Sequence, residues 1–435
     1  MKRLYLKRIF HKVDKDTLVK IVKVLFLKFS SFIFLYPLAI LIARELGTEG
    51  YGVYGFVTAL SAMLAVFCTF GSDQMIVREI AKKEENECGM VLATAVSSTS
   101  FLSCMAILLV IVVCLFLFAF TSDVVWAYTA AATPLQVVRK VFVGIGRGYG
   151  RVVQARFSEA IVQPAVALVL VFVLELTNSL NLNFAILSII ISYAFSVIYS
   201  GYYIRDKRKK LVSKFSSKQL RLWSLASIPF LGMAFSNTLI VYADRIMLGL
   251  LHSYSEAGMY LVATRNASLL MVCFGCIQFV IGSKIVKVHR ESKEKLQNMA
   301  SLHVYLLVAL GTFGFACLFF ISDFLITLFG EEFLSSKSAF LVLIVSYFLL
   351  FLGGAPTQYL FMMGESKSAL RIIVLSMVVN ILLNLILIPE YGGYGASIAT
   401  GVSLLVKTIF GSFTLFKKAG IHSSIFGCIW LRIIK

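Results

Sequence analysis

Three charged side chains stand inside an otherwise apolar stretch at residues 241–265, which reads VYADRIMLGLLHSYSEAGMYLVATR. Asp244 lies before a turn expected near residue 253, and Arg265 lies after it. At a rise of about 1.5 Å per residue, the two side chains differ in depth by about 4.5 Å on adjacent antiparallel helices, so an ion pair is feasible. Because isolated charges in an apolar surrounding are costly, Asp244, Arg245 and Arg265 are predicted to face a partner or an aqueous cavity.

A purely structural role is the alternative for these three residues. Arg245 would then extend to the outer interface, and Asp244 and Arg265 would only fix the hairpin. A cavity position is favoured, because two arginines on the outer side oppose the usual excess of positive charge in cytoplasmic segments. Asp244 is also a candidate site for the coupling of a proton or another ion.

Four further charged residues are candidates for an internal path. Lys28 has to be part of the first span, because the apolar run that follows it is too short to cross a membrane alone. Arg139 and Lys140 lie in the fourth span near its cytoplasmic end, and their long side chains could equally reach the interface. Glu159 is a second candidate for ion coupling at the inner mouth, and pairing with Arg156 one turn back is its structural alternative.

No constellation of catalytic residues accompanies these charges. The sequence has no phosphate-binding loop, no HExxH and no GxSxG motif, and its five histidines are scattered. Cys273 and Cys276 form a CxxC within an apolar run, but no second pair exists, so packing is favoured over a metal or redox site. We expect no enzyme, no metal and no cofactor, with H⁺ or Na⁺ coupling or the gradient of the substrate as the energy source.

The elements that position these charges are long apolar helices. The chain has 435 residues, of which 59% are hydrophobic and only 14% charged, whereas soluble domains have about 25% charged residues. Apolar runs of about 18 residues or more recur along it, each long enough to cross a membrane. The predicted fold is an all-α polytopic membrane protein with about twelve transmembrane helices. Their expected ranges are 18–43, 53–70, 89–118, 123–146, 155–176, 183–204, 223–250, 257–283, 302–328, 338–362, 369–388 and 393–416.

The distribution of basic residues supports this topology with both termini in the cytoplasm. Of the 41 Lys and Arg residues, only Arg44 and Lys337 fall in the outer loops. The alternation explains the formal net charge of +19 without nucleic acid, since basic segments orient the chain and contact anionic lipids. The loops are short, so the work of the protein is expected inside the membrane, as a multi-pass membrane protein. Five basic residues lie within spans: Arg139, Lys140, Arg245, Arg265 and Lys407.

A basic connection at 205–222 divides the chain into two similar halves. Residues 1–204 and 223–418 are each expected to form a lobe of six helices, and 419–435 a cytoplasmic tail. The hairpins at 44–60 and 245–269 both contain Arg, Leu-Gly, a Glu and Gly-x-Tyr. Parallel repeats of this kind are typical of transporters whose substrate path runs between the lobes.

These motifs resemble the polysaccharide (O-antigen-type) flippases of the multidrug/oligosaccharidyl-lipid/polysaccharide exporter superfamily. The resemblance follows the whole chain in collinear order. Its strongest part is an Asp with a basic neighbour, Leu-Gly, and then Gly-x-Tyr, Ala and a basic residue: Asp244, Arg245, Leu248, Gly249, Gly258, Tyr260, Ala263 and Arg265. Three further stretches are similar: ARELGTEGYGVYGF (43–56), LITLFGEEFLSSKSAFLVL (325–343) and YGGYGASIATGVS (391–403).

The resemblance implies two lobes around a cationic cavity that opens alternately to each side. The implied cargo is an undecaprenyl-pyrophosphate-linked oligosaccharide for O-antigen, capsule or exopolysaccharide, with a polymerase and chain-length machinery as candidate partners. Arginines and lysines in a low-dielectric cavity would attract its pyrophosphate. A drug/cation antiporter of the same superfamily is the alternative, but it should have acidic interior groups. A membrane-embedded glycan polymerase or ligase is a further alternative, but it should have a sizeable outer loop.

Overall fold

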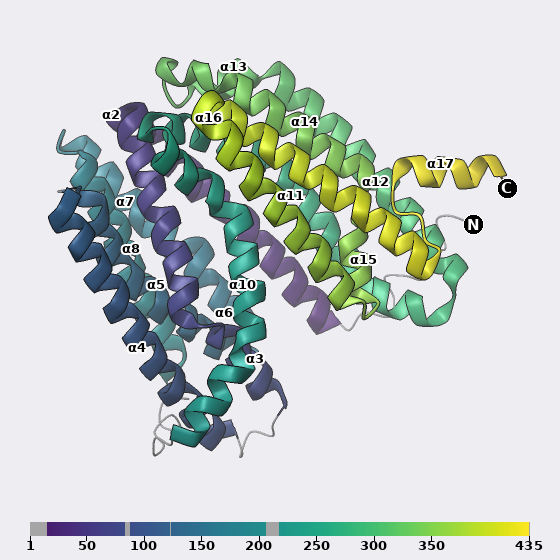
Figure 1. Ribbon diagram of the computed structural model, residues 1–435, viewed down its shortest axis with the longest axis horizontal. Coiled ribbons are helices and arrows are strands. Elements are labelled where there is room, and N and C mark those ends of the chain that lie inside the picture. Colours follow the sequence, from purple (N-terminus) through teal and green to yellow (C-terminus); the bar gives the residue numbers. More distant parts are fainter. Residues whose placement is uncertain (1–14, 83–87, 122, 206–216, 435) are drawn as a thin grey trace. The chain divides into compact units, whose positions relative to one another are not determined.

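The computed structural model describes residues 15–82, 88–121, 123–205 and 217–434 (Figure 1). Every regular element in these ranges is helical, as the predicted fold class requires. The helices of the first half are α2 (Lys15–Thr69), α3 (Ser72–Lys82), α4 (Cys88–Thr121), α5 (Val124–Gly148), α6 (Val152–Phe157), the π-turn η1 (Ser158–Val162), α7 (Gln163–Leu176) and α8 (Leu182–Tyr203). Those of the second half are α10 (Ser217–Leu251), α11 (Tyr254–Glu291), α12 (Lys293–Phe320), α13 (Ser322–Thr327), the 3₁₀ turn η2 (Glu331–Ser336), α14 (Lys337–Gly353), α15 (Pro356–Met362), α16 (Ser366–Ala419) and α17 (Ile425–Ile434).

Helices lie over each predicted span. The span predicted at 338–362 is divided into α14 and α15, and the one predicted at 302–328 is divided into α12, which begins at Lys293, and α13. Two pairs of spans lie in α2 and α16, which are unbroken ribbons but contain a non-helical residue at Gly47 (φ 68°) and Gly392 (φ 51°). Glycine adopts such positive φ angles without steric cost, so each residue separates two helical segments. In the described part of the chain, seven helices are long and apolar enough to cross a membrane, or eight if the bent α10 is one span. The number twelve stays a prediction.

The chain forms two compact units that do not follow its sequence halves. Unit 1 comprises Met1–Ala39, Phe67–Leu115 and Ala130–Leu231. Unit 2 comprises Ile40–Val66, Phe116–Thr129 and Gly232–Lys435. Each unit therefore contains segments from both halves, because the boundary cuts through α2, α4, α5 and α10. The predicted division at the 205–222 connection stays a prediction.

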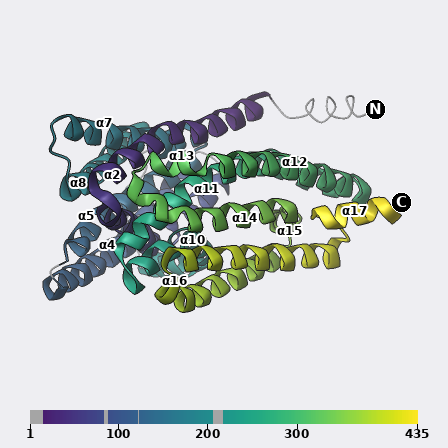
Figure 2. The ribbon, with the colours of Figure 1, turned by 90° about the horizontal axis from the view of Figure 1, so that it is seen from above.

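In unit 1, α7 and α8 lie side by side (Figures 1 and 2), and a row of serines on α8 contacts the π-turn η1 that precedes α7. Serines recur every fourth residue on α8, so one face carries no bulky side chain and the neighbouring backbone can approach closely. Ser158 Oγ lies 2.8 Å from Ser196 Oγ and 2.7 Å from Ser200 Oγ, and it also donates to the Ser196 carbonyl. The row consists of the buried residues Ser188, Ser192, Ser196 and Ser200.

In unit 2, α11, α12, α14 and α16 pack side by side (Figures 1 and 2). The turn between α10 and α11 lies near residue 253, as predicted. Ser253 fixes the start of α11 there, because its side chain accepts a hydrogen bond from the Glu256 amide at 3.2 Å. This hairpin meets the C-terminal part of α2 at two glycines. A Cβ on Gly258 would overlap the Thr48 carbonyl oxygen, and one on Gly52 would overlap that of Tyr254.

Part of the expected tail at 419–435 forms the helix α17. The chain leaves α16 at Gly420, whose φ of 65° ends that helix. Gln297 on α12 then holds the main chain of His422 from both sides: its Nε2 donates to the carbonyl at 3.0 Å and its Oε1 accepts from the amide at 2.8 Å. Cys428 is buried on the inner face of α17, whereas Phe426 and Trp430 are exposed.

Candidate functional site

A buried carboxylate in unit 2 is the centre of a polar cluster of five residues. Asp244 on α10 is 7% exposed and accepts three short hydrogen bonds. Tyr260 Oη and Thr400 Oγ1 donate to its Oδ2, each at 2.7 Å, and Asn384 Nδ2 donates to its Oδ1 at 2.6 Å. The same amide nitrogen contacts Asn380 Oδ1 at 3.2 Å. All the donors are neutral, so the cluster stabilises a carboxylate without supplying a positive charge.

The expected ion pair between Asp244 and Arg265 does not form among the described residues. On α11, Arg265 does not lie on the face that is turned toward Asp244. On α11 the residue that reaches Asp244 is Tyr260. Arg265 follows it by five positions, which corresponds to about 140° around the helix at 3.6 residues per turn. The rotational position of each helix, which the depth argument left open, decides the contact.

Arg245 and Arg265 instead lie close enough for their positive charges to interact. The Arg245 guanidinium stacks over the ring of Tyr242, with Cζ 5.7 Å from the ring centroid, and Tyr51 is also among its neighbours. Two buried polar atoms here have no hydrogen-bond partner in the described structure, Arg245 Nε and Tyr51 Oη. Buried polar groups are normally paired, so this side of the hairpin combines two cations with donor groups that a ligand or water would satisfy.

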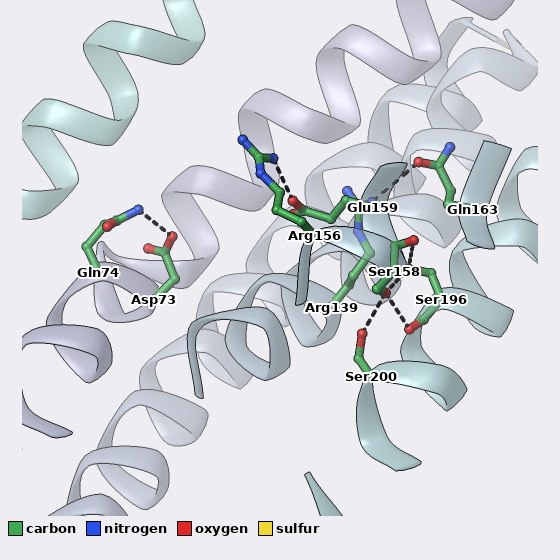
Figure 3. Close-up of polar contacts among 9 residues, drawn as sticks. All are labelled: Asp73, Gln74, Arg139, Arg156, Ser158, Glu159, Gln163, Ser196 and Ser200. Atoms are coloured by element: carbon green, nitrogen blue, oxygen red, sulfur yellow. Dashed lines mark hydrogen bonds and ion pairs between the residues drawn. The ribbon is translucent and has the colours of Figure 1, made fainter. Parts of the chain in front are cut away.

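The charged residues of unit 1 gather where α5 meets the π-turn η1 (Figure 3). Arg139 Nη1 lies 3.4 Å from Gln163 Oε1, and the guanidinium covers the Tyr193 ring at 5.3 Å from its centroid. A π-turn inserts one extra residue into a helix and often marks a functional position. Arg139 therefore points into the unit rather than along α5 to the interface, and its Nε is buried without a hydrogen-bond partner.

Lys140, Glu159 and Asp73 form a second group of charges in the same unit. The Lys140 ammonium lies within electrostatic range of both carboxylates and of Arg139. Glu159 Oε2 pairs with Arg156 Nη1 at 3.0 Å across one turn, which is the structural alternative expected for Glu159 (Figure 3). Asp73 accepts a longer hydrogen bond, 3.3 Å, from Gln74 Nε2. Lys28 lies on α2, and its side chain is outside the described part of the chain.

Sequence reasoning identified the charged residues but not the neutral partners that define their sites. Thr400, Asn380 and Asn384 are not among the candidates selected from the charged residues. Asn380 and Asn384 are four residues apart, so they share one helix face, and that face could have been paired with the intramembrane Asp244. The serine row of α8 was likewise overlooked, although its four-residue period is visible in the sequence.

The fold and these interior charges define an α-helical multi-pass membrane protein with ionisable groups within its helical bundle. The chain belongs to the polysaccharide biosynthesis protein family, which matches residues 15–282. It is 23% identical over 393 residues to a putative O-antigen transporter of Shigella flexneri, covering 85% of this chain and 90% of the relative. It is 24% identical over 380 residues to a probable low-salt glycan biosynthesis flippase of Haloferax volcanii, covering 84% and 76%.

Two solved structures share the fold over nearly the whole chain. The lipid II flippase MurJ in an inward closed conformation superposes with a TM-score of 0.72 at 14% identity, covering 96% of this chain and 92% of that one. An inward-facing multidrug resistance MATE family transporter of the MOP superfamily gives a TM-score of 0.72 at 15% identity, covering 89% and 95%. Both curated relatives are transport proteins by name, in agreement with the expectation of a transporter rather than an enzyme.

Proposed function

We propose that this protein flips an undecaprenyl-pyrophosphate-linked oligosaccharide from the cytoplasmic to the outer leaflet of the bacterial inner membrane, for the assembly of a surface polysaccharide. The glycan cargo is supported by the family and by the names of the two curated relatives. Alternating access of two six-helix lobes is part of the proposal. The released repeat unit would pass to a polymerase and its chain-length machinery.

The observation that carries the proposal is the pair of Arg245 and Arg265 in unit 2. Two guanidinium groups interact with each other, and neither forms an ion pair with a carboxylate of the described residues. Like charges in a low-dielectric region repel strongly, so an anion bound between the two guanidinium groups would stabilise both. Pyrophosphate suits it, because guanidinium groups bind phosphate oxygens in a bidentate manner. An antiporter of cations would need the opposite sign of charge here.

A flipping assay tests this role. Proteoliposomes would hold a fluorescent undecaprenyl-pyrophosphate-linked oligosaccharide, and a membrane-impermeant quencher would report its appearance in the outer leaflet. A hydrogen bond to a charged group contributes about 1.5–3 kcal/mol, so Arg265→Ala should slow flipping by about ten- to a hundredfold while the protein still inserts. Arg265→Lys should be intermediate, because a lysine keeps the charge but loses the bidentate geometry.

Arg371→Ala is the matched control, since this arginine is exposed near the start of α16 and should flip cargo at the normal rate. Unchanged flipping in the Arg245→Ala and Arg265→Ala variants would overturn the proposed role of the pair. Arg139 and Lys140 are secondary candidates for the cytoplasmic part of the path, and Lys28 stays a candidate from the sequence alone.

Ion coupling at Asp244 completes the proposal. The cluster offers oxygen atoms from a carboxylate, an amide and a hydroxyl within one buried site, which suits a proton or a hard cation such as Na⁺. Its donors come from α11 and from both segments of α16 around Gly392. Binding or release of the ion would therefore change the hydrogen bonds that join three helical segments. Glu159 is the weaker candidate, because Arg156 already balances its charge.

A further inference from the structure

A groove of about 460 Å³ opens on unit 1 beside the cytoplasmic end of α8. Val197, Ile198, Gly201 and Tyr202 of α8 line it together with Phe142 of α5 and Arg205. The lining is apolar along α8 and ends at a single guanidinium. None of these residues belongs to the charged groups described above, so the proposed transport path leaves the groove unexplained.

The surface of α8 beside the groove is a lipid-facing surface. Its exposed apolar residues occupy one stripe less than a quarter of the helix circumference wide, calculated at 100° per residue. Asn183 in the first turn is the one exposed polar residue of this helix. The apolar stripe extends from that turn to the groove, which suits the hydrocarbon region and not an aqueous cavity. Ile198 and Tyr202 at the groove are 66% and 61% exposed. The stripe consists of Phe184, Leu187, Phe195, Ile198 and Tyr202.

By the topology predicted from the sequence, the polar end of the groove lies at the cytoplasmic interface. Arg205 follows α8 by two residues and begins the basic connection RDKRKKLVSKFSSKQLR. Its guanidinium covers the Tyr202 ring at 4.5 Å from the centroid, which is a common arrangement for a cation beside an aromatic residue. Among the described residues Arg205 has no ion pair. Its hydrogen-bond donors are therefore available to an anion at the height of the lipid headgroups.

We infer that this groove binds an anionic glycerophospholipid of the cytoplasmic leaflet. One acyl chain lies between Phe142 and the Gly201 side of α8, and the phosphate contacts Arg205. Two features favour such a lipid over other occupants: apolar walls open to the bilayer, and a guanidinium placed at headgroup depth beside a run of basic residues. The lipid site does not depend on the identity of the cargo, so an experiment can support or refute it independently of the proposed transport function.

Native mass spectrometry of the full-length protein tests the site. The protein would be purified in detergent and exposed to dioleoyl-phosphatidylglycerol or dioleoyl-phosphatidylcholine, and the number of retained lipids would be counted. The wild type should retain one phosphatidylglycerol more strongly than any phosphatidylcholine. A basic residue near an anionic lipid surface contributes roughly 1 kcal/mol, or about fivefold in affinity. Arg205→Gln should therefore retain phosphatidylglycerol about fivefold less well, and Arg205→Lys should resemble the wild type.

A second variant tests the apolar part of the groove. Ile198→Trp adds bulk at an exposed position, so the helix should still fold while the acyl chain is displaced and retention is lost. Leu187→Trp is its control on the same stripe but outside the groove, and Arg371→Gln is the control for an exposed arginine on α16. Both controls should retain phosphatidylglycerol like the wild type, and all variants should melt at the wild-type temperature without lipid.

Four results would overturn the inference. The first is equal retention by the wild type and by Arg205→Gln, and the second is equal retention of the two phospholipids. The third is displacement of phosphatidylglycerol by millimolar inorganic phosphate, which would indicate a site for a free anion. The fourth is displacement by an equimolar amount of undecaprenyl phosphate, which would assign the groove to the polyprenyl carrier.

Discussion

Replacing Asp244 separates the structural from the functional role of its cluster. Asp244→Ala leaves three donors, on Tyr260, Thr400 and Asn384, without their acceptor. Side-chain hydrogen bonds between membrane helices contribute about 0.6 kcal/mol on average and about 1.7 at most. The loss of three should therefore lower the free energy of unfolding by about 2–5 kcal/mol. Asp244→Asn keeps one oxygen for Tyr260 and Thr400, so it should cost about 1 kcal/mol or less.

Function should respond differently from stability. Both variants remove the only group of the cluster that can bind a proton or carry a negative charge. Flipping driven by an imposed H⁺ or Na⁺ gradient should therefore disappear in Asp244→Asn and in Asp244→Ala alike. Unfolding in mixed micelles measures the stability, and the quencher assay in proteoliposomes with and without each gradient measures the coupling.

Two results would refute this reasoning. If Asp244→Asn keeps the same response to the gradients as the wild type, Asp244 does not couple ions. If Asp244→Ala is as stable as Asp244→Asn, the three hydrogen bonds do not hold the cluster together. The two refutations are independent, because one concerns charge and the other concerns acceptors.

Three further predictions concern other parts of the structure. Gly258→Ala places a Cβ against a backbone carbonyl oxygen, so it should lower the free energy of unfolding in mixed micelles by about 1–3 kcal/mol. Gly232→Ala is the control: a Cβ there has no atom within 4 Å, so the free energy of unfolding should not change. Gln297→Ala removes both hydrogen bonds that hold the loop before α17, so amide hydrogen exchange in α17 should accelerate. The ion pair with Lys418 lowers the pKa of Glu365. The pair should therefore stabilise the protein fully above the ordinary carboxyl pKa of about 4.5, and this stabilisation should be lost as the pH falls through the lowered pKa of Glu365. Melting temperatures measured as a function of pH would show the loss.

Each of these predictions has a matched comparison. Gln297→Glu keeps the acceptor for the His422 amide but loses the donor, so α17 should exchange at an intermediate rate. Glu365→Gln should remove the acid-dependent part of the melting curve and leave the rest unchanged. Equal exchange in the Gln297 variants and the wild type would show that α17 is held by its own packing. Identical melting profiles for Glu365→Gln and the wild type would show that the exposed pair adds nothing, as is common for surface ion pairs.

The course of the helices could be read from the sequence because the signal is local. A run of apolar residues has to become a helix in lipid, since no other element satisfies its backbone there. The breaks at Gly47 and Gly392 and the turn before Tyr254 follow equally local rules. The rotation of each helix about its axis is not local, because it depends on packing against neighbours that are far away in sequence. Asp244 therefore contacts Asn384 and Thr400, more than a hundred residues away, and not the arginine at its own depth.

The same distinction applies to the charged residues. Arg245 and Arg265 could be selected by type and position, since the predicted topology places them on the outer side, where arginines are uncommon. The closeness of Arg245 to Tyr51 could not be predicted, because it requires α2 to pack against the hairpin. Glu159 shows the reverse case: its partner Arg156 lies one helical turn away, so the sequence alone was enough to suggest the ion pair.

The crossing of α2 and α11 at Gly52 and Gly258 has a consequence for the energy of separating these helices. At these two glycines the contact consists of backbone atoms, and beside them the rings of Phe56 and Tyr254 pack edge to face. The direct polar link beside the glycines is the hydrogen bond from Ser255 Oγ to Thr48 Oγ1 at 2.8 Å. Separating the helices here would therefore break one ring contact and one hydrogen bond, but it would require no rotamer change at the glycines themselves.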